Sequence, residues 1–298
     1  MSTTPWVQET RPQFLLLAVL LVFHASALAA WQGSVDIVHS LIAAVALVLL
    51  HASVNVLNDW HDFSKTEIDK HAPHTPFSGG SGLLPQGRVT PSQALGLGIG
   101  LLVAGCALGL YLAWSAGWPL LVIGVAGAVL VVTYTPFLNK IGLGEVGAGL
   151  GLGVLPVVGT YFLLTGRFDA VAWVSSIPAG LLTYNLLLLN EFPDAEADAA
   201  GGRRHMVTLL GKQGARWLYA AVEASVYLTI IVAVAARLLT PWALLGLGSA
   251  PFAVRAVRAA IADYASFEKI VPAQGANVMA VLATNALLGI GYVIAALV

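Results

Sequence analysis

The stretch LIAAVALVLLHASVNVLNDWHDFSKTEID, Leu41 to Asp69, joins a long apolar run to a cluster of acids. Asp59, Asp62, Glu67 and Asp69 fall within eleven positions after that run. The run has the length of roughly 20 residues that crosses the hydrocarbon core of a bilayer. Polar groups at membrane depth tend to be functional. The stretch therefore predicts a transmembrane helix that ends in a functional site.

The whole chain has the composition of a membrane protein. Of its 298 residues, 58% are hydrophobic and only 10% are charged, whereas a soluble domain carries about 25% charged residues. The net charge of −1 argues against a nucleic-acid partner. The single cysteine, Cys106, excludes an intrachain disulfide and a metal site of several cysteines.

Nine apolar runs of spanning length follow one another along the chain. They cover residues 13–31, 36–57, 92–114, 118–137, 143–165, 170–190, 214–236, 240–256 and 275–297. We therefore expect an all-α integral membrane protein with nine transmembrane helices, forming a single domain over residues 1–298.

Basic residues predict the orientation of these helices in the bilayer. With the N-terminus in the cytoplasm, the cytoplasmic segments hold twelve Lys and Arg residues, and the opposite side holds only Arg167 and Arg237. Such a bias indicates that the N-terminus and two acid-rich loops, residues 58–91 and 190–213, are cytoplasmic. The C-terminus then lies on the opposite side. ASALAAWQG (Ala25–Gly33) resembles a signal-peptidase site, whose use would leave the remaining topology unchanged.

A second motif matches the first. LLLLNEFPDAEADAAGGRRHMVTLLG (Leu186–Gly211) contains Asn190-Glu191-Phe192-Pro193-Asp194, which aligns with Asn58-Asp59-Trp60-His61-Asp62. Each reads Asn, acid, aromatic, any residue, Asp, at the end of an even-numbered run. This spacing favours two four-helix halves plus a terminal helix.

The spacing of the acids suits divalent cations. Asp59 and Asp62 are three positions apart and Asp194 and Asp198 four, so each pair shares one side of a helix end. Mg²⁺ takes a few carboxylate oxygens and completes its shell with water and phosphate oxygens. Two such clusters could bind a diphosphate through Mg²⁺. They could instead be solvated loop acids, or they could serve an ion-coupled transporter. Their position at helix ends rather than mid-membrane favours an enzyme.

At these residues the chain resembles the UbiA superfamily of intramembrane prenyltransferases. The family motifs "NDxxD" and "DxxxD" correspond to Asn58–Asp62 and Asp194–Asp198. The continuation DFSKTEID, and YTPFLNKIGLGEVGAGLGLGVLPVVGTYFLLTG (Tyr134–Gly166), are similar to the branch that prenylates 1,4-dihydroxy-2-naphthoate in menaquinone synthesis. The chain departs from many relatives after its first motif, because its first arginine there is Arg88.

The resemblance implies a central cavity, a prenyl diphosphate donor, Mg²⁺ and a lipophilic aromatic acceptor, with 1,4-dihydroxy-2-naphthoate favoured. Hydroxybenzoate, tetrapyrrole acceptors and terpene cyclisation within the same fold stay open. The partners implied are these small molecules and the lipid bilayer, with no nucleic acid and no protein partner.

Candidate site residues follow from the motifs and the resemblance. Catalytic roles are assigned to Asp62, Asp194, Asn58 and Lys140. Metal binding is assigned to Asp59, Asp62, Asp194, Asp198 and Asp69. Substrate binding is assigned to Asn55, Lys65, Asn185, Asn190, Arg203, Arg204 and Tyr134. The positive-inside bias alone would also place the basic residues of this set in cytoplasmic loops.

Overall fold

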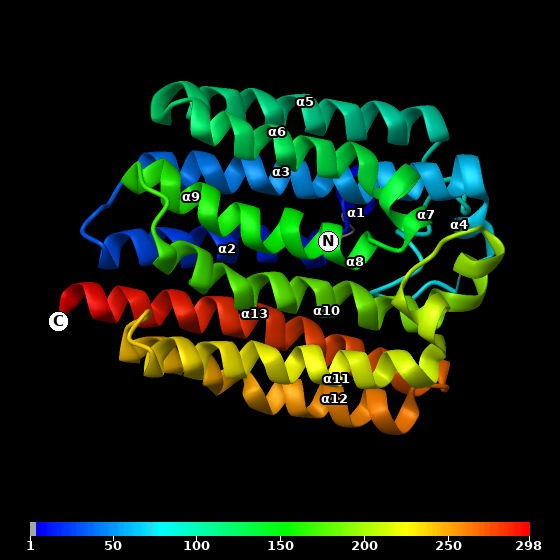
Figure 1. The fold of residues 1–298 in the computed structure, drawn as a ribbon. Helices are drawn as coiled ribbons and strands as arrows, with labels where there is room; N and C mark the ends of the chain where they lie inside the picture. Colours follow the sequence, from blue (N-terminus) through cyan, green and yellow to red (C-terminus); the bar gives the residue numbers. More distant parts are fainter. Residues whose placement is uncertain (1–3, 72) are drawn as a thin grey trace.

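The computed structural model describes residues 4–71 and 73–298, and this described part consists of helices and their connections (Figure 1). The elements are, in chain order, α1 (Pro5–Glu9), α2 (Pro12–Trp31), α3 (Ile37–His61), η1 (Asp62–Thr66), α4 (Ile68–His71), α5 (Pro91–Ala116), α6 (Trp118–Thr133), η2 (Tyr134–Leu138), α7 (Asn139–Ile141), α8 (Gly144–Gly149), η3 (Leu150–Val154), α9 (Leu155–Thr165), α10 (Ala170–Ala200), α11 (Met206–Ala235), η4 (Pro241–Ser249), α12 (Ala250–Asp263) and α13 (Phe267–Leu297).

Nine helical segments within the described residues are long and apolar enough to cross a membrane, which confirms the predicted number of spans. They are Pro12–Trp31, Ile37–Thr66, Pro91–Ala116, Trp118–Ile141, Gly144–Thr165, Ala170–Ala200, Met206–Ala235, Pro241–Asp263 and Phe267–Leu297. The chain is thus an all-helical, multi-pass integral membrane protein.

Both acidic motifs lie on helices, although residues 58–91 and 190–213 were expected to be loops. The second span continues through the π-helical turn η1 to Thr66, and α10 continues to Ala200. Pro193 lies inside α10, where it removes a single backbone donor. The alanine-rich segment after it has high helix propensity and carries the helix onward. The carboxylates are therefore held on rigid elements.

The two motifs lie at the same end of the bundle. In Figure 1 the C-terminal ends of α3 and α10 are on the right, with α4 and α7, and the C-terminus of the chain is at the opposite end of the bundle. Helix α2 packs against α3, α9 and α13, while α10 packs against α8, α11 and α13. The long helices run side by side, so segments far apart in sequence meet at each end.

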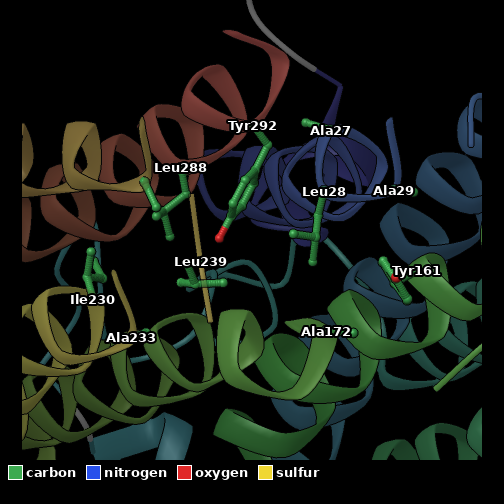
Figure 2. Packing of buried hydrophobic residues seen from close by; sticks show 11 residues of the cluster. Ala27, Leu28, Ala29, Tyr161, Ala172, Ile230, Ala233, Leu239, Leu288 and Tyr292 are labelled. Atoms are coloured by element: carbon green, nitrogen blue, oxygen red, sulfur yellow. The ribbon is translucent and has the colours of Figure 1, made fainter. Parts of the chain in front are cut away.

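One large apolar cluster lies away from the motifs, where α2, α9, α10, α11 and α13 meet (Figure 2). Leu28, Ile230, Leu288 and Tyr292 are buried there. Tyr292 also shares a 2.7 Å hydrogen bond between its hydroxyl and the Ser175 hydroxyl. Apolar packing and buried hydrogen bonds therefore hold this end, and charges concentrate at the other.

Glycines allow η3 and α10 to approach each other at backbone distance. A Cβ on Gly153 would lie 2.6 Å from the Cα of Gly180 and 2.8 Å from the carbonyl oxygen of Ala179. Backbone atoms cannot move aside as a flexible side chain can. Small residues at such a crossing let membrane helices pack closely, and this crossing positions α8 beside the motif end of α10.

We predict that Gly153→Ala destabilises the fold by about 1–3 kcal/mol, the usual cost of overpacking. The measurement is thermal unfolding of the purified protein in detergent. Gly100→Ala is the matched control, because nothing lies within 4 Å of a Cβ at Gly100. Equal melting temperatures for the two variants would contradict the proposed crossing.

Candidate functional site

Arg203 joins the two acidic motifs. Its Nη2 donates to Asp62 Oδ2 and, at 3.1 Å, to Asn58 Oδ1. Its Nη1 donates to Asp198 Oδ1 at 3.2 Å. Burial opposes the charge on Arg203, but the neighbouring Asp62 and Asp198 raise the pKa of the guanidinium above its ordinary value. The motifs that the sequence places 132 positions apart therefore meet at one buried cation.

A glycine-rich loop, residues 76–82, lies against both motifs. The backbone N–H of Gly79 donates to Asp194 Oδ2 at 3.1 Å, and that of Ser81 donates to Asp59 Oδ2 at 2.6 Å. Gly80 has a φ of +70°, and a Cβ there would lie 2.6 Å from Asp69 Oδ1. Glycine at this position allows the backbone to pass directly over the carboxylates.

The segment before the first span fastens this loop in place. Arg11 Nη2 donates to the carbonyl of Phe77 at 2.9 Å, and Ser81 Oγ donates to Glu9 Oε2 at 2.7 Å. Arg11 has a φ of +54°, an unfavourable backbone conformation for a residue with a side chain. Sequence reasoning missed Glu9 and Arg11 as site residues, because only the folded chain brings them beside the motifs.

Three acids, Glu9, Asp59 and Asp69, are buried under the loop. Burial, and after it the charge of Asp59, raises the pKa of Glu9 to about 7. Burial, and after it Asp59, Asp62 and Glu9, raises the pKa of Asp69 to about 8. This end of the protein therefore carries more buried acids than its own cations neutralise, and the raised pKa values favour the protonated form of Glu9 and Asp69.

A cavity of about 330 Å³ opens beside these groups. Its polar end includes Arg11, Asn58, Asp194 and Arg203, and its walls are mainly apolar side chains of α3, α6, η3, α9 and α10. This arrangement suits a ligand with a charged head and a hydrophobic tail.

Most of the predicted site residues lie at the cavity or directly beside it. The cavity is lined by Asn55, Asn58, Tyr134, Asn190, Asp194, Asp198 and Arg203. Asp59, Asp62 and Asp69 are buried next to it through the contacts above.

Four predicted residues do not lie where they were expected. The side chains of Lys65, Lys140 and Arg204 are exposed, and these residues are not among the described residues that line the cavity. Asn185 was expected at an acceptor pocket but is buried between helices, where its Nδ2 donates to Glu223 Oε2 at 2.8 Å and to the carbonyl of Tyr219 at 3.0 Å. The face of α10 that carries Asn185 packs on α11 rather than on the cavity.

The site contains the oxygens that a hard cation needs. Buried oxygens of Asp62, Asp194 and Asn190 have no hydrogen-bond partner in the part of the chain that the structure describes. Oxygens of Asp59 and Asp69 are also without such a partner there. Asp198 differs, because one oxygen accepts from Arg203 and the other lies 3.2 Å from His205 Nε2. Asp62 and Asp194 therefore fit Mg²⁺ better than Asp198 does.

Comparisons with known proteins relate the chain to one family. The sequence profile of the UbiA prenyltransferase family matches residues 16–271. A 1,4-dihydroxy-2-naphthoate octaprenyltransferase of Mycobacterium leprae is 31% identical, covering 86% of this chain and 85% of that protein. One of Bacillus subtilis is 28% identical, covering 84% and 80%.

Solved structures share the fold. A UbiA homolog from Aeropyrum pernix superposes with a TM-score of 0.72 at 18% identity, over 93% of this chain and 97% of that one. A UbiA homolog from Archaeoglobus fulgidus, bound to GPP and Mg²⁺, gives a TM-score of 0.62 at 12% identity, over 95% and 99%.

We predict that Asp69→Asn stabilises the metal-free protein more at pH 8 than at pH 5. Because the pKa of Asp69 is raised to about 8, the folded state retains a proton that the unfolded chain loses near pH 4. Stability therefore falls as the pH rises between these values. Asparagine mimics the protonated form. At pH 8 in EDTA, the melting temperature of Asp69→Asn should exceed that of the parent protein by about 2–4 °C for each 1 kcal/mol of added folding stability.

The exposed carboxyl of Glu196 provides the control for this measurement. Glu196→Gln should leave the pH dependence of the melting temperature unchanged. A gain from Asp69→Asn that is the same at both pH values would contradict the raised pKa.

Proposed function

Because the chain belongs to the UbiA prenyltransferase family, we propose that its polar end binds a prenyl diphosphate with Mg²⁺ and that its cavity holds the prenyl chain. The observation that supports this best is the convergence of the two motifs, with free carboxylate oxygens, at the mouth of an apolar cavity. Asp62 and Asp194 would hold the metal. When bound, Mg²⁺ neutralises the diphosphate and makes it a better leaving group.

Arg203 and Arg11 are the basic residues placed to contact the diphosphate. Both line the cavity beside Asp194, and guanidinium groups suit phosphate oxygens because they donate in a fixed planar fork. Arg203 is already engaged by Asp62 and Asp198. Arg11 has a buried Nε without a hydrogen-bond partner among the described residues, so it has free donor capacity.

The acceptor we propose is 1,4-dihydroxy-2-naphthoate. Relatives similar over most of their length carry that substrate in their names, and a 2-carboxy-1,4-naphthoquinone phytyltransferase of Synechocystis is 30% identical. In the reaction the bond between the prenyl carbon and the diphosphate oxygen breaks, and the diphosphate leaves with the electron pair. A ring carbon of the acceptor attacks the prenyl carbon, and a proton or carbon dioxide is lost from the ring.

The chain's own residues protect this step. The glycine-rich loop covers the polar end, which limits the access of water to a cationic prenyl group. Tyr134 lines the cavity and can stabilise positive charge with its ring. Asn58 donates from Nδ2 to Asp62 Oδ2 at 3.0 Å and accepts from Thr135 Oγ1 at 3.0 Å, so it orients the metal-binding carboxylate.

The orientation we propose places this polar end in the cytoplasm. The support is the distribution of basic residues, twelve on the side of the motifs against Arg167 and Arg237 on the other. The donor would then enter from the cytoplasmic side of the membrane.

We predict that Asp62→Asn and Asp194→Asn each lower turnover by about 100-fold or more, as loss of a key electrostatic contact does. The assay follows prenylated naphthoate by mass spectrometry, with purified protein, Mg²⁺, a prenyl diphosphate and 1,4-dihydroxy-2-naphthoate. EDTA should abolish the product and added Mg²⁺ should restore it.

Glu196→Gln is the control for the removal of an acid at this end of the protein, because Glu196 lies two positions after Asp194 on α10 with a side chain 94% exposed. Full activity in both aspartate variants would refute the metal assignment. Product from hydroxybenzoate but not from the naphthoate would assign hydroxybenzoate as the acceptor. A cyclised hydrocarbon formed without an acceptor would assign terpene cyclisation as the reaction.

We also predict that Arg11→Gln raises the KM for the prenyl diphosphate about tenfold or more, since a hydrogen bond to a charged group contributes about 1.5–3 kcal/mol. The acceptor KM should change little, and Arg11→Lys should recover part of the loss. Arg88→Gln is the control, because the Arg88 side chain is exposed. An unchanged donor KM, with only a lower melting temperature, would assign Arg11 to loop fastening alone.

A further inference from the structure

A second group of ligand-type side chains lies beside the aspartate site. Glu145 comes from α8, Glu191 from α10 and His205 from the residue that precedes α11. One ligand atom from each lies within 4.8 Å of the others, and all three side chains are buried. None belongs to the aspartate positions assigned to Mg²⁺.

These side chains have free atoms that point toward one another. The backbone N–H of Met206 donates to Glu145 Oε1 at 2.6 Å, which fixes that carboxylate. Its Oε2 has no hydrogen-bond partner among the described residues, although Glu145 is 0% exposed. Glu191 Oε2 likewise has no hydrogen-bond donor in the described part of the chain, and the ring nitrogens of His205 lie near the carboxylate oxygens of Glu191 and Asp198 without forming a regular hydrogen bond. Buried polar atoms without partners are costly unless a ligand satisfies them.

The position of His205 matches that of a metal-binding imidazole. Its Nδ1 lies 3.3 Å from Glu191 Oε2, and its Nε2 lies 3.2 Å from Asp198 Oδ2. Two ligands at about 2.0–2.1 Å from one tetrahedral ion are separated by about 3.3 Å. The other nitrogen of a metal-binding histidine commonly faces a carboxylate, which fixes the ring orientation. Asp198 is placed to do this for His205.

We propose that Glu145, Glu191 and His205 bind a divalent transition-metal ion of the zinc class, separate from the Mg²⁺ that accompanies a prenyl diphosphate. An imidazole ligand favours such an ion over Mg²⁺, which prefers an all-oxygen shell. A cation here also offsets the repulsion between two buried carboxylates, which Arg203 does not contact. Glu191 and His205 line the cavity, so an ion held by them would lie at the cavity wall.

The test measures metal binding without any substrate. Protein purified in detergent is stripped with a chelator, and Zn²⁺ binding is measured by calorimetry, with the bound metal quantified by mass spectrometry after desalting. We expect one tightly bound Zn²⁺ ion per molecule in the parent protein and in Asp62→Asn, which lacks a proposed Mg²⁺ ligand. Glu145→Gln and His205→Gln should weaken the binding of that ion at least tenfold, and Asp198→Asn about 10–100-fold.

His74→Gln is the matched control, because the His74 side chain is exposed. Its loss should leave the binding of the Zn²⁺ ion unchanged. Melting temperatures of the metal-free variants show whether each is folded. The proposal fails if the parent binds no Zn²⁺ above the control level, which would leave His205 as a polar partner of Glu191 and Asp198 only. It also fails if Asp62→Asn removes the Zn²⁺ binding while Glu145→Gln retains it. Neither result depends on prenyl transfer, so this proposal and the proposed function can fail independently.

Discussion

Two acidic motifs can share one end of the bundle because a buried cation lies between them. Arg203 pairs with Asp62 of the first motif and with Asp198 of the second. Without it, carboxylates from α10 and from the turn after α3 would face each other in a buried place, where charge is expensive. Removing one partner of a buried pair commonly costs about 3–5 kcal/mol. Charge neutralisation is therefore necessary for the motif ends to meet, in addition to the apolar packing around them.

This neutralisation is incomplete, and the remainder gives the site its binding capacity. Arg203 binds one oxygen of Asp62, and the other, Oδ1, has no hydrogen-bond partner among the described residues. Gly79 likewise donates to Oδ2 of Asp194, and Oδ1 of Asp194 has no such partner. Glu9 and Asp69 hold their protons to a pH well above the usual range, because they are buried with other acids. Active sites often carry such strain at a cost in stability. The distant apolar cluster of Figure 2 has no comparable excess of charge, and it supplies part of the stability that offsets the strain.

The sequence was sufficient for the features that depend on local pattern. Hydropathy alone located the nine spans, and the matching order of Asn58-Asp59 and Asn190-Glu191 indicated two related helix ends. The extent of those helices was not predictable, because Pro193 and the polar residues after it look like a loop. The rotation of a helix was not predictable either. Asn185 lies on the same helix as Asp194, yet it faces Glu223 rather than the cavity.

The sequence also could not predict which basic residues lie at the site. Lys65 follows the first motif and Lys140 lies at the end of the fourth span, but topology alone favours lysine in such segments, and both side chains are exposed. Arg11 is 48 positions before Asp59 and still lies among the residues of the polar end. A contact of this kind is fixed by the route of the chain, through the left-handed backbone at Arg11 and its bond to Phe77. The first arginine after the first motif is Arg88, at which the chain departs from many relatives, and its side chain is exposed.

Asp198 connects the two halves of the polar end. One of its oxygens neutralises Arg203, and the other faces His205, so its charge is shared between the Arg203 side and the Glu145–Glu191 side. A change at either partner would therefore alter the electrostatic environment of the other through a single carboxylate. Because Asp198 lies on the same helix as Asp194 and Glu191, small movements of that helix would also reach both groups together. The residue that the motif marks as a metal ligand is, in this fold, better placed to couple two neighbouring sites.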